Sequence, residues 1–290
     1  MKRIGWIAIK VVTLAGCAMA QQAPPAQQSP PLQQTAPAQQ TPPPLQAPPA
    51  QGEPVRVVMP QDTVALDALL DGLHERGQTL RDFSGNVALV TTDTSSGEDP
   101  TTQTGQVVYQ KLPDQNARIR ITFEKKTIGE RTLEQRIEYL LDGEWLTDRD
   151  YRRRIEIRRQ VLRPGEKVDL LKLGEGPFPM PIGQPRDAVK NLFDVSLLPV
   201  DAAAPAGSSH VRLVPKSGTD LSRKFTSIDV WVDPTLNMPV RIDTLDRNET
   251  VVRRTDLANL KVNAGVSDKA FELPAVNDKE WTRQDEAFGE

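Results

Sequence analysis

The chain has 290 residues, a formal net charge of −3 and a single cysteine. Acidic and basic residues are mixed, so no strong electrostatic field would attract nucleic acid, and we expect no such partner. A lone cysteine cannot form a disulfide within the chain, so the fold must depend on its apolar core.

Residues 1–20 are typical of a secretory signal peptide, because Lys2 and Arg3 precede an apolar run too short to span a bilayer. Two processing sites compete there. Residues 14–17, Leu-Ala-Gly-Cys, match a bacterial lipobox, in which the thiol of Cys17 receives a diacylglycerol. Residues 18–20, Ala-Met-Ala, fit an ordinary cleavage site that would discard Cys17. We therefore expect a periplasmic protein, with a lipid anchor at Cys17 if the lipobox is used.

Residues 21–56 consist almost entirely of Gln, Pro and Ala. Such a segment cannot bury enough apolar surface to offset the entropy of ordering it, so we expect a disordered linker. Fully extended, it would reach on the order of 100 Å, which suits a tether. A folded domain is expected over residues 57–283, followed by a flexible tail over residues 284–290.

The start of this domain predicts one helix and then strands. Asp62 or Thr63 can cap a helix that carries a leucine stripe from Leu66 to Leu73, and Gly77 lies where a helix would stop. Period-two alternation then predicts strands within residues 85–92, 105–111 and 117–123.

Residues 136–158 predict an antiparallel meander. Ile137, Tyr139 and Leu141 alternate with Arg136, Glu138 and Leu140, which is the period of a strand. Asp142-Gly143 is a strong hairpin signal, and further strands carry Trp145 and then Ile155 with Ile157. The arginines from Arg149 to Arg163 are expected on a solvated strand face. Binding of an anionic headgroup or a partner is the alternative interpretation.

Residues 174–185 place Phe178, Met180 and Ile182 between prolines, which excludes a helix or a central strand. These side chains must pack against the core, a ligand or a partner. A short helix is predicted after Pro185, and the remaining strands are predicted within residues 193–198, 210–216, 227–233, 240–244, 250–257 and 260–263. The expected fold is mainly β with α, a single antiparallel sheet of about ten or eleven strands curled around an interior and covered by helices.

Signals for catalysis are absent from the sequence. The two histidines, His74 and His210, have no partners at metal-binding spacing, and no nucleophile elbow or phosphate-binding glycine loop is present. We expect neither an enzyme nor a protein with a metal or another cofactor.

Several short motifs follow one another in a characteristic order after the first helix. They are Phe83-Ser-Gly, residues 105–113, the Asp142-Gly-Glu-Trp corner, and residues 211–216, 228–238, 246–250 and 263–274. Their order over residues 65–274 resembles the LolA-like family of periplasmic lipoprotein carriers. The resemblance implies an unclosed half-barrel with a helical lid, whose apolar concave side holds acyl chains.

The resemblance also implies a lipid-binding site and partners. By position, the expected lining consists of Ile119, Ile121, Phe123, Tyr139 and Trp145, with Phe178, Met180 and Ile182 as mobile contributors. The partners would be acyl chains of lipoproteins or lipids, together with a membrane surface or envelope proteins, and the protein would be a monomer in outer-membrane lipoprotein sorting or transport.

One position departs from the family pattern. Where the carriers have a basic residue before a proline, this chain has Leu112, with Lys111 one step earlier. The alternative function is therefore an envelope-stress or regulatory sensor that uses the same fold to bind a protein partner.

Overall fold

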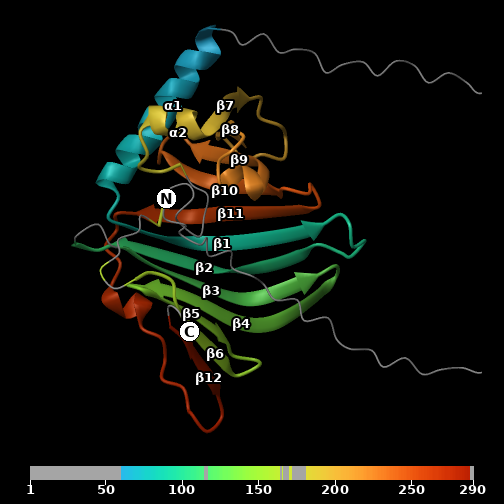
Figure 1. Ribbon diagram of the computed structural model, residues 1–290, viewed down its shortest axis with the longest axis vertical. Coiled ribbons are helices and arrows are strands. Elements are labelled where there is room, and N and C mark those ends of the chain that lie inside the picture. The colour runs from blue at the N-terminus through green and yellow to red at the C-terminus, as the bar shows by residue number, and fades with distance from the viewer. Residues whose placement is uncertain (1–59, 114–116, 164, 166–169, 172–180, 288–290) are drawn as a thin grey trace, which may run out of the picture. The chain divides into compact units, whose positions relative to one another are not determined.

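The computed structural model describes residues 60–113, 117–163, 165, 170–171 and 181–287. The expected signal peptide, Cys17 and the linker lie outside the described residues. Figure 1 shows one curved sheet flanked by the α-helices α1 (Pro60–Thr79) and α2 (Arg186–Leu192). Both helices are close to their predicted positions. Among the described residues, no helix combines the length and the apolar character needed to cross a membrane.

Twelve strands form this sheet within the described part of the chain. They are β1 Asp82–Asp93, β2 Thr101–Lys111, β3 Ala117–Ile128, β4 Arg131–Asp142, β5 Trp145–Asp150, β6 Ile155–Gln160, β7 Phe193–Leu198, β8 Ser209–Pro215, β9 Phe225–Asp233, β10 Met238–Asp246, β11 Val251–Val262 and β12 Thr282–Glu286.

The order of the strands across the sheet is β12-β6-β5-β4-β3-β2-β1-β11-β10-β9-β8-β7. Every neighbouring pair is antiparallel except β12 and β6, which are parallel. The edge strands β12 and β7 do not pair with each other, so the sheet stays open (Figure 1). The expected unclosed half-barrel with helical elements is confirmed.

The strands differ from the predicted ones at two places, each for a physical reason. Residues 250–263 were predicted as two strands but form β11 alone, because the break is a bulge at Asn259, which has a positive φ of 54°. Strand β12 has no apolar alternation, so its residues show no strand pattern. Residues 284–286, expected at the start of the tail, lie in β12.

Alternation along the strands gives the sheet two chemically different faces. On β3, residues 117, 119, 121 and 123 are buried, and the residues between them are half-buried. Strand pairing places Ile121 opposite Tyr139, so the apolar row continues from β3 onto β4. We call this apolar side the inner face, and the opposite side the outer face. Buried inner residues and α1 form one apolar cluster.

Helix α1 packs on the inner side through Leu66, Leu70 and Leu73. Its second half also contacts the segment before α2, where the Gly183 amide donates to the Leu73 carbonyl at 3.1 Å. A Cβ atom on Gly77 would meet the Cα of Gly183 at 2.2 Å. Only glycine allows this close approach between the helix and that segment.

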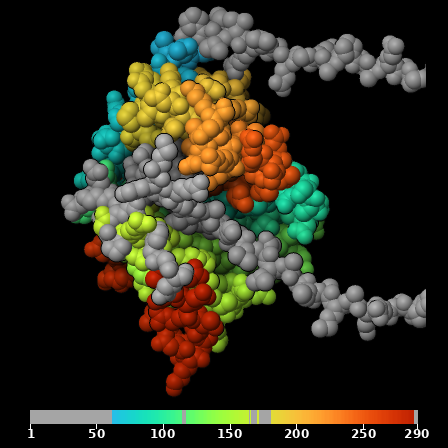
Figure 2. Space-filling model, viewed as in Figure 1, coloured from blue at the N-terminus to red at the C-terminus, as the bar shows by residue number. Residues whose placement is uncertain are grey.

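After β11 the chain crosses the outer face and ends as an edge strand. We call residues 264–286 the C-terminal strap. It contains the short 3₁₀ helix η3 (Asp268–Phe271), which contacts β3, and then β12, which pairs with β6. In Figure 2 the strap, coloured red, packs beside the yellow-green strands β5 and β6. The strap therefore connects strands that are distant in the sequence.

Candidate functional site

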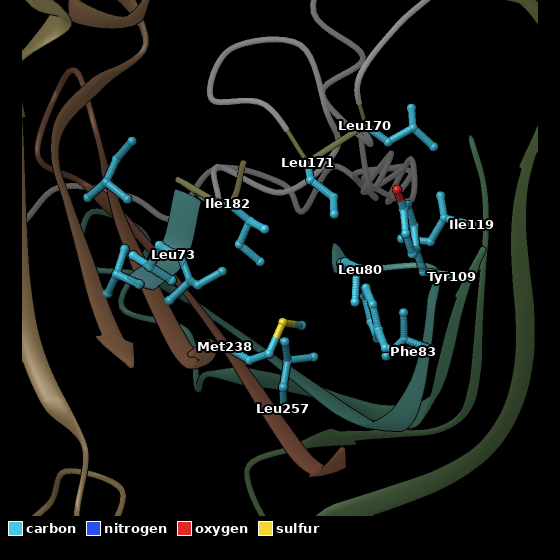
Figure 3. Close-up of a cluster of buried hydrophobic side chains, with 14 of the residues drawn as sticks. Leu73, Leu80, Phe83, Tyr109, Ile119, Leu170, Leu171, Ile182, Met238 and Leu257 are labelled. Atoms are coloured by element: carbon cyan, nitrogen blue, oxygen red, sulfur yellow. The ribbon is translucent and has the colours of Figure 1, made fainter. Parts of the chain in front are cut away.

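The inner face of the sheet encloses an apolar interior. Figure 3 shows side chains from several strands, from Leu73 of α1 and from the short segments at Leu170, Leu171 and Ile182 converging on this region. Two aromatic rings stack within this interior: the ring centroids of Phe83 and Tyr109 are 5.2 Å apart. The interior is the candidate site because its chemistry suits an apolar ligand.

Four of the predicted lining residues meet in this interior. Ile119, Ile121, Phe123 and Tyr139 are all buried and lie on the inner face of β3 and β4. The rings of Phe123 and Tyr139 make an edge contact with centroids 6.4 Å apart. Alternation along β3 was the sequence signal that grouped them.

Trp145 does not join them. It pairs with Asp142 across the hairpin, whereas Leu141 and Leu146, the next pair along, point to the inner face. Its ring lies on the outer face under the guanidinium of Arg158, whose Cζ is 4.9 Å from the ring centroid. The structure thus places Trp145 away from the proposed lining.

The remaining predicted contributors lie in residues 174–185. Ile182 is fully buried in the apolar cluster, with 0% exposure. Phe178 and Met180 lie outside the described residues. Leu170 and Leu171, which the sequence did not single out, are buried in the same cluster. Their signal, an isolated Leu-Leu pair in a polar stretch, was too short to assign to either face.

A polar rim borders the interior at β5 and β6. Asp148 pairs with Tyr139 and therefore shares the inner face. Burial raises the pKa of Asp148, and the nearby Arg159, with its Nη1 3.9 Å from Asp148 Oδ2, partly offsets that effect. Burial also raises the pKa of the Tyr139 phenol. Charge in this corner of the interior is poorly solvated.

The outer face beneath the strap carries a buried polar network. Glu138 is 0% exposed and accepts hydrogen bonds from Arg120 Nη2 at 2.7 Å, Arg136 Nη2 at 2.6 Å and the Tyr151 hydroxyl at 2.8 Å. Burial alone would raise the pKa of Glu138, but the bonds from Arg136, Arg120 and Tyr151 together lower it. The carboxylate is therefore held ionised out of contact with water.

A second carboxylate continues the network towards the edge of the sheet. Glu156 Oε2 accepts from Arg149 Nε at 2.8 Å, and Glu156 Oε1 accepts from Arg283 Nε of the strap at 3.0 Å. Arg149 Nη1 also donates to the Pro274 carbonyl at 2.7 Å. These bonds join strands β5 and β6 to the strap.

This network corrects the interpretation of the arginines as one solvated face. Arg149 and Glu156 are buried, although Arg152, Arg153 and Arg154 are exposed as expected. The physical reason is the strap, which covers the outer face with its own carbonyl and side-chain groups. The sequence of residues 149–163 could not indicate this burial, because the strap that covers them lies more than a hundred residues further along the chain.

Both histidine side chains make contacts between elements of the fold. His74 Nδ1 lies 2.9 Å from the Gly183 carbonyl oxygen. His210 Nε2 lies 2.7 Å from Asp229 Oδ1, and its ring stacks on Trp231 with centroids 4.1 Å apart. Within the residues that the structure describes, no cluster of three or more His, Cys, Asp or Glu side chains could hold a metal ion.

Comparisons with known proteins give matches only among solved structures. No model of a known protein family matches the sequence, and no curated protein does. A chain of the Pseudomonas aeruginosa MucA/MucB complex is 12% identical over 72% of this chain, with a TM-score of 0.41, and this chain spans only 61% of its length.

Two further structures match along nearly their whole length. An uncharacterized conserved protein from Thermus thermophilus is 13% identical over 76% of this chain and 99% of its own, with a TM-score of 0.42. A LolA superfamily protein from Nitrosomonas europaea is 15% identical over 72% of this chain and 97% of its own, with a TM-score of 0.32. A LolA superfamily protein is thus among the solved structures to which this chain is similar.

Proposed function

We propose that this chain is a non-enzymatic envelope protein that holds acyl chains of lipids or lipoproteins in its apolar interior. The observation that carries the proposal is the one apolar cluster that joins the inner face of the sheet, α1, Leu170, Leu171 and Ile182. Each buried methylene contributes about 0.8 kcal/mol, so a sixteen-carbon chain would gain roughly 10 kcal/mol before ordering costs. No reactive group is needed for such a function.

Access to the interior requires movement of the elements that cover it. At the surface, α1 is joined to α2 by ion pairs of Asp67 with Lys190 and with Arg186. Arg76 Nε donates to the Leu236 carbonyl at 2.6 Å. Half-exposed ion pairs of this kind contribute little to stability, so they oppose a separation of α1 from α2 only weakly. An acyl chain would replace the apolar contacts that α1 gives up.

A brominated acyl chain tests whether the ligand enters the interior. All three tryptophans beyond the expected signal peptide, Trp145, Trp231 and Trp281, lie on the outer face or in the strap. Bromine quenches indole fluorescence only at short range. We expect wild-type fluorescence to be insensitive to brominated phospholipid, and the added fluorescence of Tyr139→Trp to be quenched.

The wild-type protein is the matched control in this experiment, since it differs only at the inner face. Equal quenching of both proteins would place the lipid on the outer face, and binding of no lipid by either protein would refute the proposal. Native mass spectrometry of protein purified from its own envelope gives an independent measurement. It should reveal a co-purified acyl lipid, and it also reports whether the mature chain begins at a diacylated Cys17 or at Gln21.

The alternative function, a regulatory module that binds a protein partner, would favour a side-chain-filled interior and an apolar patch on the outside. The exposed large apolar residues among the described positions are Val64, Ile128, Val200 and Val214. They belong to α1, β3, the β7–β8 connection and β8, so no single element presents an exposed apolar row. On this second criterion the described residues favour the lipid-binding function.

A further inference from the structure

A buried amide donor in the segment before α2 has no hydrogen-bond acceptor among the described residues. Gln184 carries this donor, its Nε2, and the residue is 5% exposed. Ile182 and Val189, on either side of it in the chain, both belong to the apolar cluster. The other unpartnered buried donors in the described part of the chain, Arg120 Nε and Trp231 Nε1, belong to outer-face side chains.

The backbone that carries Gln184 is fixed to α1. The Gly183 amide donates to the Leu73 carbonyl at 3.1 Å, and the Gly183 carbonyl oxygen lies 2.9 Å from His74 Nδ1. The contact between Gly77 and Gly183 fixes the same segment from another side. These contacts hold in place the backbone from which the Gln184 side chain extends.

An unsatisfied buried N–H is costly, and nearly all buried donors in proteins have a partner. A ligand that brings an acceptor would remove this cost on binding. Lipids and acylated proteins carry such an acceptor where the acyl chain begins, because an ester or amide carbonyl oxygen accepts hydrogen bonds and donates none. The side-chain amide of Gln184, which lies in the chain between two residues of the apolar cluster, supplies a matching donor.

We propose that Gln184 Nε2 donates a hydrogen bond to the ester or amide carbonyl of a bound acyl chain and so selects carbonyl-linked chains over ether-linked chains. This inference rests on the proposed lipid-binding function. It adds a determinant of specificity that burial of methylenes alone cannot supply, since ester and ether lipids of equal chain length bury nearly the same apolar surface.

The test compares a diacyl phosphatidylglycerol with its diether analogue of the same chain length. Wild-type protein should bind the ester lipid about 10-fold more tightly, the effect of one satisfied buried donor. Gln184→Met keeps the length of the side chain but removes the donor. It should lower ester affinity about 10-fold while leaving ether affinity unchanged, and so abolish the preference.

Gln184→Leu is the second variant, because leucine is apolar, slightly shorter than glutamine and has no hydrogen-bond donor. It should lose the preference for the ester lipid as well, which keeps the test decisive if Gln184→Met does not fold. Gln106→Leu, at an exposed glutamine of β2, is the matched control and should keep the wild-type ratio.

Equal wild-type affinities for ester and ether lipids would overturn the inference while leaving the proposed function intact. A preference that survives both Gln184 variants would do the same. Failure of the wild-type protein to bind either lipid would instead refute the proposed function, and the inference with it.

Discussion

Gly77 and Gly183 lie in direct backbone contact, so that a Cβ atom on Gly77 would meet the Gly183 amide nitrogen at 2.4 Å. This contact joins α1 to the segment that carries Ile182 and Gln184. Gly183 itself has a positive φ of 81°, which favours glycine there as well. The position of the covering helix therefore depends on two residues without side chains.

Gly77→Ala should destabilise the protein although alanine favours a helix by about 1 kcal/mol over glycine. The added methyl group would meet backbone atoms that cannot move aside, and such overpacking typically costs about 1–3 kcal/mol. Urea denaturation would measure the change. Gly72→Ala is the matched control in the same helix, where the new Cβ would meet only the Asn237 side chain at 3.0 Å. Equal effects of the two substitutions would contradict the role of the contact.

Glu138→Gln should destabilise the protein by about 3 kcal/mol at neutral pH, because it leaves Arg120 and Arg136 without a charged partner under the strap. The folded state lowers the pKa of Glu138, so its stabilisation is present above the ordinary glutamate pKa and is lost as the pH falls. The difference between wild type and variant should thus shrink below roughly pH 4.3. Thermal unfolding at several pH values would measure it, and a difference independent of pH would argue against this assignment.

Asp148→Asn should have the opposite sign, although Asp148 lies only one strand away from Glu138. Burial raises the pKa of Asp148, so its ionised form destabilises the folded state at neutral pH. The variant should unfold at a higher temperature at pH 7, by roughly 2–4 °C for each kcal/mol gained. The gain should diminish as the pH falls through the raised pKa and vanish below about pH 3.9. A lower melting temperature at pH 7 would show that the ion pair with Arg159 outweighs the cost of burial.

Phe271→Ala should loosen the strap without affecting the inner face. The Phe271 ring is buried, with the Arg118 Cζ 4.2 Å from its centroid, and removing such a ring typically costs about 3–5 kcal/mol. Hydrogen exchange should increase in β12 and β6, while the affinity of the folded protein for an acyl ligand stays at the wild-type value. Val214→Ala, at an exposed position of β8, should change stability by less than about 0.5 kcal/mol. A large loss of ligand affinity would show that the two faces are coupled.

Much of the sheet could be predicted from the sequence because strand signals are local. The alternation in β3 identified Ile119, Ile121 and Phe123, and the Asp142-Gly143 turn identified the β4–β5 hairpin. The same turn also predicts that Trp145 lies on the outer face. A two-residue loop places Trp145 opposite Asp142, and residues paired in this way share a face.

The outer-face network could not be predicted, because its partners are distant in the sequence and its strand lacks a pattern. Glu156 and Arg283 are 127 positions apart, and β12 consists of polar residues. Gln184 was likewise undetectable, since a glutamine after a proline-rich segment gives no sign of burial. Only tertiary packing distinguishes it from a surface residue.

The C-terminal strap also sets an order of assembly. Synthesis from the N-terminus produces β6 long before β12, and pairings between such distant segments form slowly. Arg149 and Glu156 can meet early, being seven positions apart, but the carbonyls that receive Arg120 and Arg149 arrive last. A chain cut short before residue 264 would retain every apolar strand of the interior and still leave charged groups uncovered on the opposite side. The C-terminal strap would then distinguish chains whose outer-face charges are covered from chains in which they are still exposed to water.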